Sequence, residues 1–252
     1  MIIRENETEF IMISQHDHAA VSEKFIERLQ ENYFPRDDLN NSVLYAIRMH
    51  DCGWENFDKE PVWNDEARAP YSFIDFPLAA KTVLYKHGID EVEKNDSYAA
   101  LLCSEHYSRF LANESTPEAR AFVAYEQARQ LTIIDENGRN NHLFTFHYEL
   151  LQFADSLSLF LCLNEPGSGK ESVHPFFKNG IPLPAALEEQ LGKKLELEWL
   201  DEGTVACEPF PFQEPIELSI IQKRIPKDSI SKHGVRKSYL EAPEAYLNLK
   251  VI

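Results

Sequence analysis

The chain is poor in the features that mark disulfide-bonded, secreted or membrane-spanning proteins. It has four cysteines in 252 residues, widely spaced and without a Cys-x-x-Cys pair, which argues against a disulfide framework and a zinc knuckle. No apolar run reaches the roughly 18 residues that a membrane span requires. Residues 1–7 lack the layout of a signal peptide, so we expect a cytoplasmic protein.

Basic residues are also scarce. The chain has 25 Lys and Arg against 42 Asp and Glu, which gives a formal net charge of −17. Such a surface repels nucleic-acid backbones and anionic membranes, so we expect neither as a partner. A small anionic substrate remains compatible with this charge, because a buried metal ion dominates the field around it. One basic concentration near the C-terminal end is expected to be a solvated face: Lys223, Arg224, Lys227, Lys232, Arg236 and Lys237.

What the chain does contain is enough apolar sequence for an ordered globule, with 43% hydrophobic and 12% aromatic residues. The spacing of these residues predicts helices over 15–30, 39–51, 76–87, 96–111, 116–134 and 141–163. It predicts strands over 1–4, 9–13, 195–200, 204–207, 216–225 and 246–251. Gly88 is expected to end the third helix, the Asn137-Gly138 pair the fifth, and residues 53–75 to form a long irregular loop.

These elements indicate a mainly α-helical fold with a small antiparallel sheet built from the N-terminal hairpin and the C-terminal region. We expect a helical part over 1–165, and a linker with a β-rich appendage over 166–252. The linker contains Gly167-Ser168-Gly169-Lys170, which resembles the end of a phosphate-binding loop. Asn164 stands where that motif needs its first glycine, and Glu171 replaces its magnesium-binding Ser or Thr, so the segment is interpreted as a linker.

The most informative feature is the adjacent pair His50-Asp51 at the end of the second expected helix. Neighbours on a helix point about 100° apart, so both can reach one ion only near a helix end or an opened turn. On its own the pair also suits a helix cap. Asp155 adds weight, because it lies among leucines and phenylalanines in the last long helix. A buried carboxylate without a partner is costly enough to protonate or to recruit a cation.

Three strings lie in order along successive helices: Asp17-His18-Ala19, His50-Asp51-x-Gly53-Trp54 and Ala154-Asp155-x-Leu157-Ser158-Leu159. With His106 between the last two, this order resembles the HD-domain superfamily over roughly residues 1–165. Within that superfamily the strings look like one bacterial family of uncharacterised proteins. The resemblance implies an HD-like helical bundle that holds one or two ions of Mn, Fe, Zn, Co or Ni, metals that imidazole and carboxylate ligands suit. The implied metal ligands are His18, His50, Asp51 and Asp155.

The same resemblance assigns His106 to a second metal or to the phosphate of a substrate, rather than to the core. Asp17 or Glu105 could orient a metal-bound imidazole. His87 is expected to interact with the dipole at its helix end. His147 lies two helical turns before Asp155, so a core role is expected for it.

The leading hypothesis is a metal-dependent hydrolase of the HD type that acts on a phosphate ester of a small molecule, with Asp51 and His106 as catalytic residues. Trp54 follows His-Asp-x-Gly where the familiar hydrolytic members often have Lys. If that Lys contacts phosphate, its loss argues against routine phosphate chemistry. Two alternatives stay open. One is a di-iron oxygenase, which needs a further histidine, and the other is a non-catalytic binding module that a metal stabilises.

Overall fold

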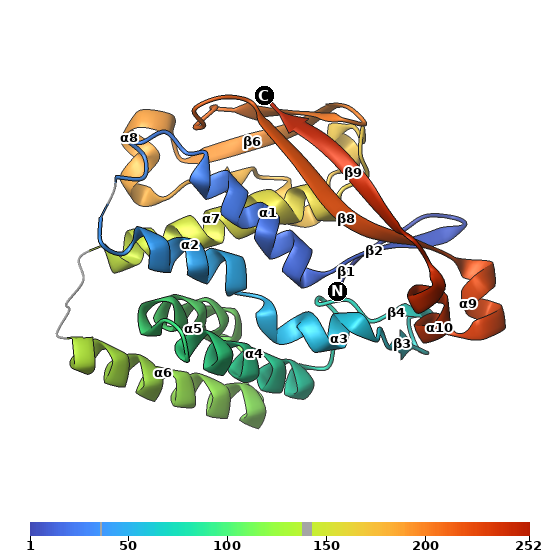
Figure 1. Cartoon of the computed structure of the whole chain (residues 1–252), viewed down its shortest axis with the longest axis horizontal. Coiled ribbons are helices and arrows are strands. Elements are labelled where there is room, and N and C mark those ends of the chain that lie inside the picture. Colours follow the sequence, from blue (N-terminus) through green and yellow to red (C-terminus); the bar gives the residue numbers. More distant parts are fainter. Residues whose placement is uncertain (36, 138–142) are drawn as a thin grey trace.

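A curled sheet lies along one side of the molecule and helices stack against it (Figure 1). The computed structural model describes residues 1–35, 37–137 and 143–252. Within these residues seven strands form the sheet, in the order β1-β2-β8-β9-β7-β6-β5, and only β7 and β9 pair in parallel. The strands are β1 (Ile2–Glu5), β2 (Glu9–Ile13), β5 (Ile181–Pro182), β6 (Lys194–Asp201), β7 (Thr204–Glu208), β8 (Ile216–Pro226) and β9 (Glu244–Val251).

The sheet corrects the expected fold class. A mainly α-helical bundle with a small antiparallel sheet is wrong, and so is an all-α description, because the sheet is large and mixed. Alternate residues of β6 and β8 are buried, so each strand presents one apolar face that has to be covered. Strand β8 pairs with β2, which places Ile225 opposite Phe10. The division at residue 165 stays a prediction, although strands from both parts share this sheet.

The helices lie in layers below the sheet (Figure 1). Helices α1 and α7 pack on its strands, α2 packs on both of them, and α4, α5 and α6 pack together further from the sheet. Their bounds are α1 (Gln15–Glu27), α2 (Asn40–Met49), α4 (Leu78–Glu93), α5 (Ser97–Leu111), α6 (Pro117–Asn137) and α7 (Phe144–Leu163). The expected break at Gly138 and the helix start at Asn141 lie outside the described residues. In the described parts, no helix has the length and apolar character to cross a membrane.

Gly88 does not end its helix, because α4 continues to Glu93. Its role is packing. A Cβ on Gly88 would lie 2.8 Å from the backbone nitrogen of Gly53, and a Cβ on Gly53 would lie 2.2 Å from the carbonyl oxygen of Leu84. The two glycines therefore let the backbone that follows Asp51 touch α4. The expectation for His87 is also wrong, since His87 lies inside the helix, half exposed, with an ion pair to Glu91 at 3.8 Å.

Residues 53–75 are not an irregular loop. They contain most of the 3₁₀ helix η1 (Cys52–Trp54), helix α3 (Glu55–Lys59) and the short hairpin of β3 (Trp63–Asn64) with β4 (Ala69–Pro70). Trp54 is buried and packs edge-on against the rings of Phe57, Phe76 and Tyr85. This aromatic group fixes the segment that follows the His50-Asp51 pair.

The C-terminal part contains further short elements that the apolar spacing does not predict. Helices α9 (Lys227–His233) and α10 (Val235–Glu241) connect β8 to β9 and lie beside the β3–β4 hairpin (Figure 1). Between α7 and β6 lie η2 (Lys170–Ser172), η3 (Pro175–Phe177), η4 (Ala185–Leu187) and α8 (Glu188–Leu191). The segment from Gly167 to Lys170 thus has no strand before it and no long helix after it, unlike a phosphate-binding loop.

Candidate metal centre

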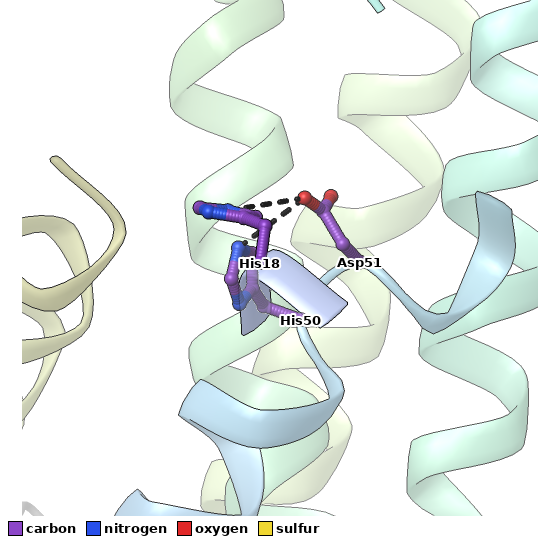
Figure 2. A group of neighbouring side chains, drawn as sticks. All are labelled: His18, His50 and Asp51. Carbon is purple, nitrogen blue, oxygen red and sulfur yellow. Dashed lines mark ion pairs between the residues drawn. The ribbon is translucent and has the colours of Figure 1, made fainter. Parts of the chain in front are cut away.

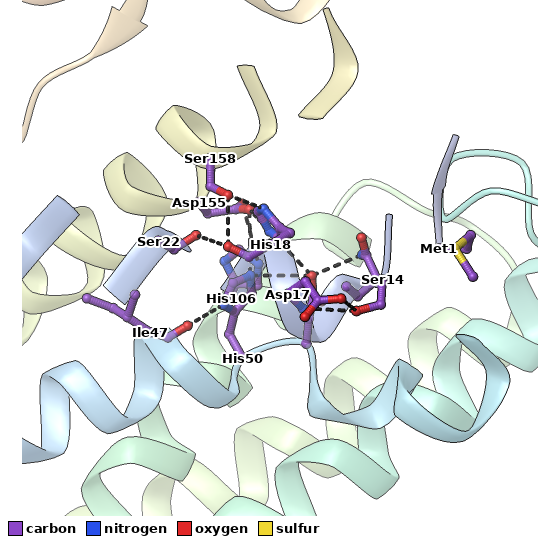
Figure 3. A network of polar contacts seen from close by, with 12 residues as sticks. Met1, Ser14, Asp17, His18, Ser22, Ile47, His50, His106, Asp155 and Ser158 are labelled. Carbon is purple, nitrogen blue, oxygen red and sulfur yellow. Dashed lines mark hydrogen bonds and ion pairs between the residues drawn. The ribbon is translucent and has the colours of Figure 1, made fainter. Parts of the chain in front are cut away.

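Four helices bring the predicted site residues into one buried cluster (Figures 2 and 3). His18 comes from the first turn of α1, His50 and Asp51 from the end of α2, His106 from the middle of α5, and Asp155 from the middle of α7. Each of the five is at most 7% exposed. The end of α2 places His50 and Asp51 on the same side because the helix opens into η1 there.

The donor atoms have the spacing of ligands around a single ion. Atoms held about 2.1 Å from one metal lie roughly 3.0 to 3.4 Å from one another. His18 Nε2 is 3.0 Å from Asp155 Oδ1 and 3.6 Å from Asp51 Oδ2. His50 Nε2 is 3.4 Å from Asp51 Oδ2 and 3.6 Å from Asp155 Oδ1. Figure 2 draws the contacts of both imidazoles with Asp51. This buried group of histidines and aspartates could therefore hold a metal ion.

Neighbouring groups fix the protonated nitrogen of both imidazoles. The Ser158 hydroxyl donates its proton to the carbonyl oxygen of His18 at 2.8 Å, so at His18 Nδ1, also 2.8 Å away, it accepts (Figure 3). His50 Nδ1 is 2.7 Å from the carbonyl oxygen of Ile47, which can only accept. Each ring therefore keeps a proton on Nδ1, which leaves the lone pair of Nε2 for a metal ion or a second proton.

Those lone pairs face carboxylates, which calls for positive charge between them. Nε2 of His18 and of His50 is buried without a hydrogen-bond partner. Burial favours neutral Asp155, but the two imidazoles outweigh it and hold the pKa of this carboxyl far below its ordinary value. Burial likewise disfavours charged His50, but Asp51 and Asp155 outweigh it and raise the pKa of His50 well above its ordinary value. A proton or a metal ion can supply the charge.

The Asp51 carboxylate is held by two residues that the sequence reasoning missed. Gln15 Nε2 donates to Oδ2 at 3.0 Å, and the Tyr107 hydroxyl donates to Oδ1 in a short hydrogen bond. Gln15 is anchored in turn, because its backbone N–H donates to Asp58 Oδ2 at 2.6 Å. The ring of Tyr107 stacks on Tyr85 with 3.8 Å between centroids. These contacts leave Asp51 one orientation, with Oδ2 toward the imidazoles.

Two carboxylates expected to orient the imidazoles have other partners. Asp17 accepts a hydrogen bond from the Ser14 hydroxyl at 2.6 Å, at the start of α1. Glu105 accepts from Arg109 at 2.7 Å on the surface of α5. Ser158 and the Ile47 carbonyl take the orienting role instead. His147 is buried away from the cluster, as expected, where Nδ1 is 2.8 Å from the Tyr98 hydroxyl.

His106 lies at the edge of the cluster. Its Nε2 is 3.9 Å from Asp155 Oδ2, the oxygen that points away from His18. Its ring packs on His50 and on Phe110, with centroid distances of 5.3 and 4.4 Å. Burial lowers the pKa of His106 to about 4, so the ring is neutral near pH 7. Its Nδ1 is buried without a hydrogen-bond partner.

Two adjoining cavities reach the cluster. The inner one has a volume of about 30 Å³, room for one or two water molecules. Its polar walls are Gln15, Asp51, His106 and Asp155. The outer one is a cleft of about 460 Å³, a volume typical of small-molecule sites. Both cavities are bounded by Phe73, Tyr85, Phe110, Asp155 and Leu159, so the cleft leads to the cluster.

Replacing Ser158 with alanine is expected to weaken metal binding by about 10- to 100-fold, the usual effect of removing a group that orients a ligand. The variant loses the acceptor for His18 Nδ1–H, so the ring can rotate. Competition with a chelator measures the affinity. Ser22→Ala is the matched control, because Ser22 donates to the same His18 carbonyl at 3.2 Å. Equal losses in both variants would show that the carbonyl contact matters rather than the ring contact.

The fold and the cluster define a protein with a buried histidine and aspartate centre suited to a metal ion. Residues 1–227 match the family described as "Protein of unknown function (DUF3891)", and the chain belongs to this family. No curated protein and no solved structure matches the chain. The family covers both the helices of the centre and the sheet as far as β8. The resemblance to the HD-domain superfamily stays a prediction.

Proposed function

We propose that the protein is a metal-dependent hydrolase that cleaves a phosphate ester at this centre. The observation that carries the proposal is the pair of partnerless Nε2 atoms of His18 and His50, which face two ionised carboxylates at ligand spacing. A divalent Mn, Fe, Zn, Co or Ni ion suits this donor set. The residues that would hold it are His18, His50, Asp51 and Asp155.

A bound metal would polarise a phosphoryl oxygen and lower the pKa of water. The protein's part is to place the water and to take its proton. The inner cavity provides the space, and two of the residues that line it, Gln15 and His106, each have a buried polar atom without a hydrogen-bond partner, Oε1 and Nδ1. Gln15 Oε1 can accept one hydrogen bond from a water in the cavity. With its own proton on Nε2, toward Asp155, His106 can accept the other proton at Nδ1.

One ion fits the centre better than two. In the described parts of the chain two groups of residues could hold a metal ion, His18 with His50 and Asp51, and His50 with His106 and Asp155, and both contain His50. Its Nδ1 is bonded to Ile47, so Nε2 alone is free, and one nitrogen lone pair cannot bind two ions. This favours hydrolysis over the di-iron oxygenase. The cleft that leads to Asp155 favours an enzyme over a structural centre, because structural metal sites are closed and catalytic ones keep an open position.

The test is hydrolysis of p-nitrophenyl phosphate and bis(p-nitrophenyl) phosphate by protein loaded with each metal in turn. Replacing His106 with asparagine is expected to lower kcat by about 10²- to 10⁴-fold, as loss of a general base does, while the metal content stays the same. His87→Asn, an exposed histidine on α4, should leave both unchanged. Protein with one equivalent of metal and no activity on either ester would contradict the proposal.

A further inference from the structure

The cleft that leads to the metal centre is built mostly of apolar side chains. Its walls include Leu78 from α4, Phe110 from α5, Leu159 from α7, and Phe177 and Ile181 from the segment before β6. Two large aromatic side chains of the cleft stay exposed to solvent, Phe110 by 52% and Phe176 by 57%. Exposed apolar residues gathered at a cleft are typical of a binding site for an apolar group.

The charges in the cleft are few. Among the described residues that line it, Lys81 is the only cation, and Glu114 and Asp155 are the acids. Lys81 Nζ donates to the Ile74 carbonyl oxygen at 2.9 Å, and an ammonium group has two further donors. Lys81 precedes Tyr85 by four residues on the same face of α4, about 6 Å away. Tyr85 bounds the inner cavity, and both Lys81 and Asp155 line the outer cleft, so the cation lies one helical turn from a wall residue of the centre.

This charge count limits the ligand to a single anionic group. A nucleoside triphosphate brings about four negative charges, which one lysine beside Glu114 cannot balance. The charge of a ligand with one phosphate group can be balanced by Lys81 together with a metal ion held at the centre. The remaining walls, which are apolar and aromatic, would stay in contact with water unless the rest of the ligand covers them.

We propose that the cleft binds a phosphate monoester of an apolar alcohol, with the alkyl or aryl part on the apolar walls and Lys81 Nζ donating to the phosphate oxygens. The inference rests on the proposed function for the reaction at the centre. The cleft's preference for an apolar chain with one anionic group does not depend on catalysis and can be measured separately.

The probes are methyl-, butyl- and octylphosphonate, whose carbon–phosphorus bonds resist hydrolysis. Calorimetric titration of metal-loaded protein is expected to show affinity rising about fourfold for each methylene group that becomes buried. Octylphosphonate should therefore bind at least about a hundredfold more tightly than methylphosphonate. Equal affinity for the three probes, or tighter binding of a nucleoside triphosphate than of octylphosphonate, would overturn the proposal.

Replacing Lys81 with methionine keeps an apolar stem and removes the charge. Octylphosphonate affinity is expected to fall about tenfold, the effect of one charge-assisted hydrogen bond, whereas binding of 1-octanol stays the same. Lys86→Met is the matched control, because Lys86 pairs with Asp90 on the surface of the same helix. Unchanged octylphosphonate affinity in the Lys81 variant would remove Lys81 from the site.

Metal content measured on the same samples separates this inference from the proposed function. One equivalent of metal together with equal affinity for all three probes would refute the inference and leave the hydrolase in place. Chain-length-dependent binding by protein that takes up no metal would support the ligand class and refute the hydrolase.

Discussion

Replacing Asp155 with alanine is expected to lower the bound transition metal from about one equivalent per chain to below ~0.1. Asp155 Oδ1 lies 3.0 Å from His18 Nε2 and 3.6 Å from His50 Nε2, so the variant loses the oxygen that faces both imidazoles. It also loses one of the two negative charges that favour a cation there. Elemental analysis measures the content, on protein purified without added metal and after reconstitution with Mn, Fe, Zn, Co and Ni.

Two further variants make the result specific. Asp155→Asn keeps the side-chain volume and should lose metal as well, which separates a missing ligand from a cavity. Glu126→Gln changes a fully buried carboxylate that pairs with Arg129 outside the centre, and should keep its metal. One equivalent retained by Asp155→Ala would place the metal elsewhere, and two irons in the native protein would move the oxygenase ahead. No metal even after reconstitution would contradict the metal centre itself.

The residues that gather at the centre could be predicted from the sequence because short local motifs carry the resemblance to the HD-domain superfamily, which implied them. His50 and Asp51 at a helix end and Asp155 in an apolar helix need no knowledge of distant pairing. The sheet depends on such knowledge. Strand β2 pairs with β8, with Phe10 opposite Ile225, more than two hundred residues apart. The alternation of apolar and polar residues in β8 indicates that one face of the strand is buried, but it does not indicate which strands lie beside it.

Some of the residues that support the centre could also have been found from the local sequence, and one could not. Ser158 lies three residues after Asp155, and Gln15 three before His18, so each shares a helix face with a ligand and helical spacing could have found it. Tyr107 lies in α5 and bonds to Asp51 at the end of α2, a different helix. The only feature of the local sequence that marks Tyr107 is its neighbour His106. The rule that a glycine ends a helix failed for Gly88. A glycine is present there because the backbone packs closely against Gly53.

Replacing Gly53 with alanine is expected to lower the free energy of unfolding by about 3 kcal/mol, at the upper end of the usual cost of overpacking. The new Cβ would lie 2.2 Å from the carbonyl oxygen of Leu84 and 3.0 Å from its carbon. These are backbone atoms of α4, so no side-chain rotation relieves the contact. The segment has to move away from α4, and Asp51, two residues earlier, moves with it. Metal affinity should therefore fall together with stability.

Urea denaturation gives the stability, and chelator competition gives the affinity. Gly88→Ala should destabilise less, because its Cβ would meet the backbone nitrogen of Gly53 at the longer distance of 2.8 Å. Gly169→Ala is the control, since a Cβ there has nothing within 4 Å and the residue has a φ of −71°, which alanine adopts freely. A Gly53 variant as stable as the Gly169 variant would mean that the backbone after Asp51 does not rest on α4. The orientation of Asp51 would then depend on Gln15 and Tyr107 alone.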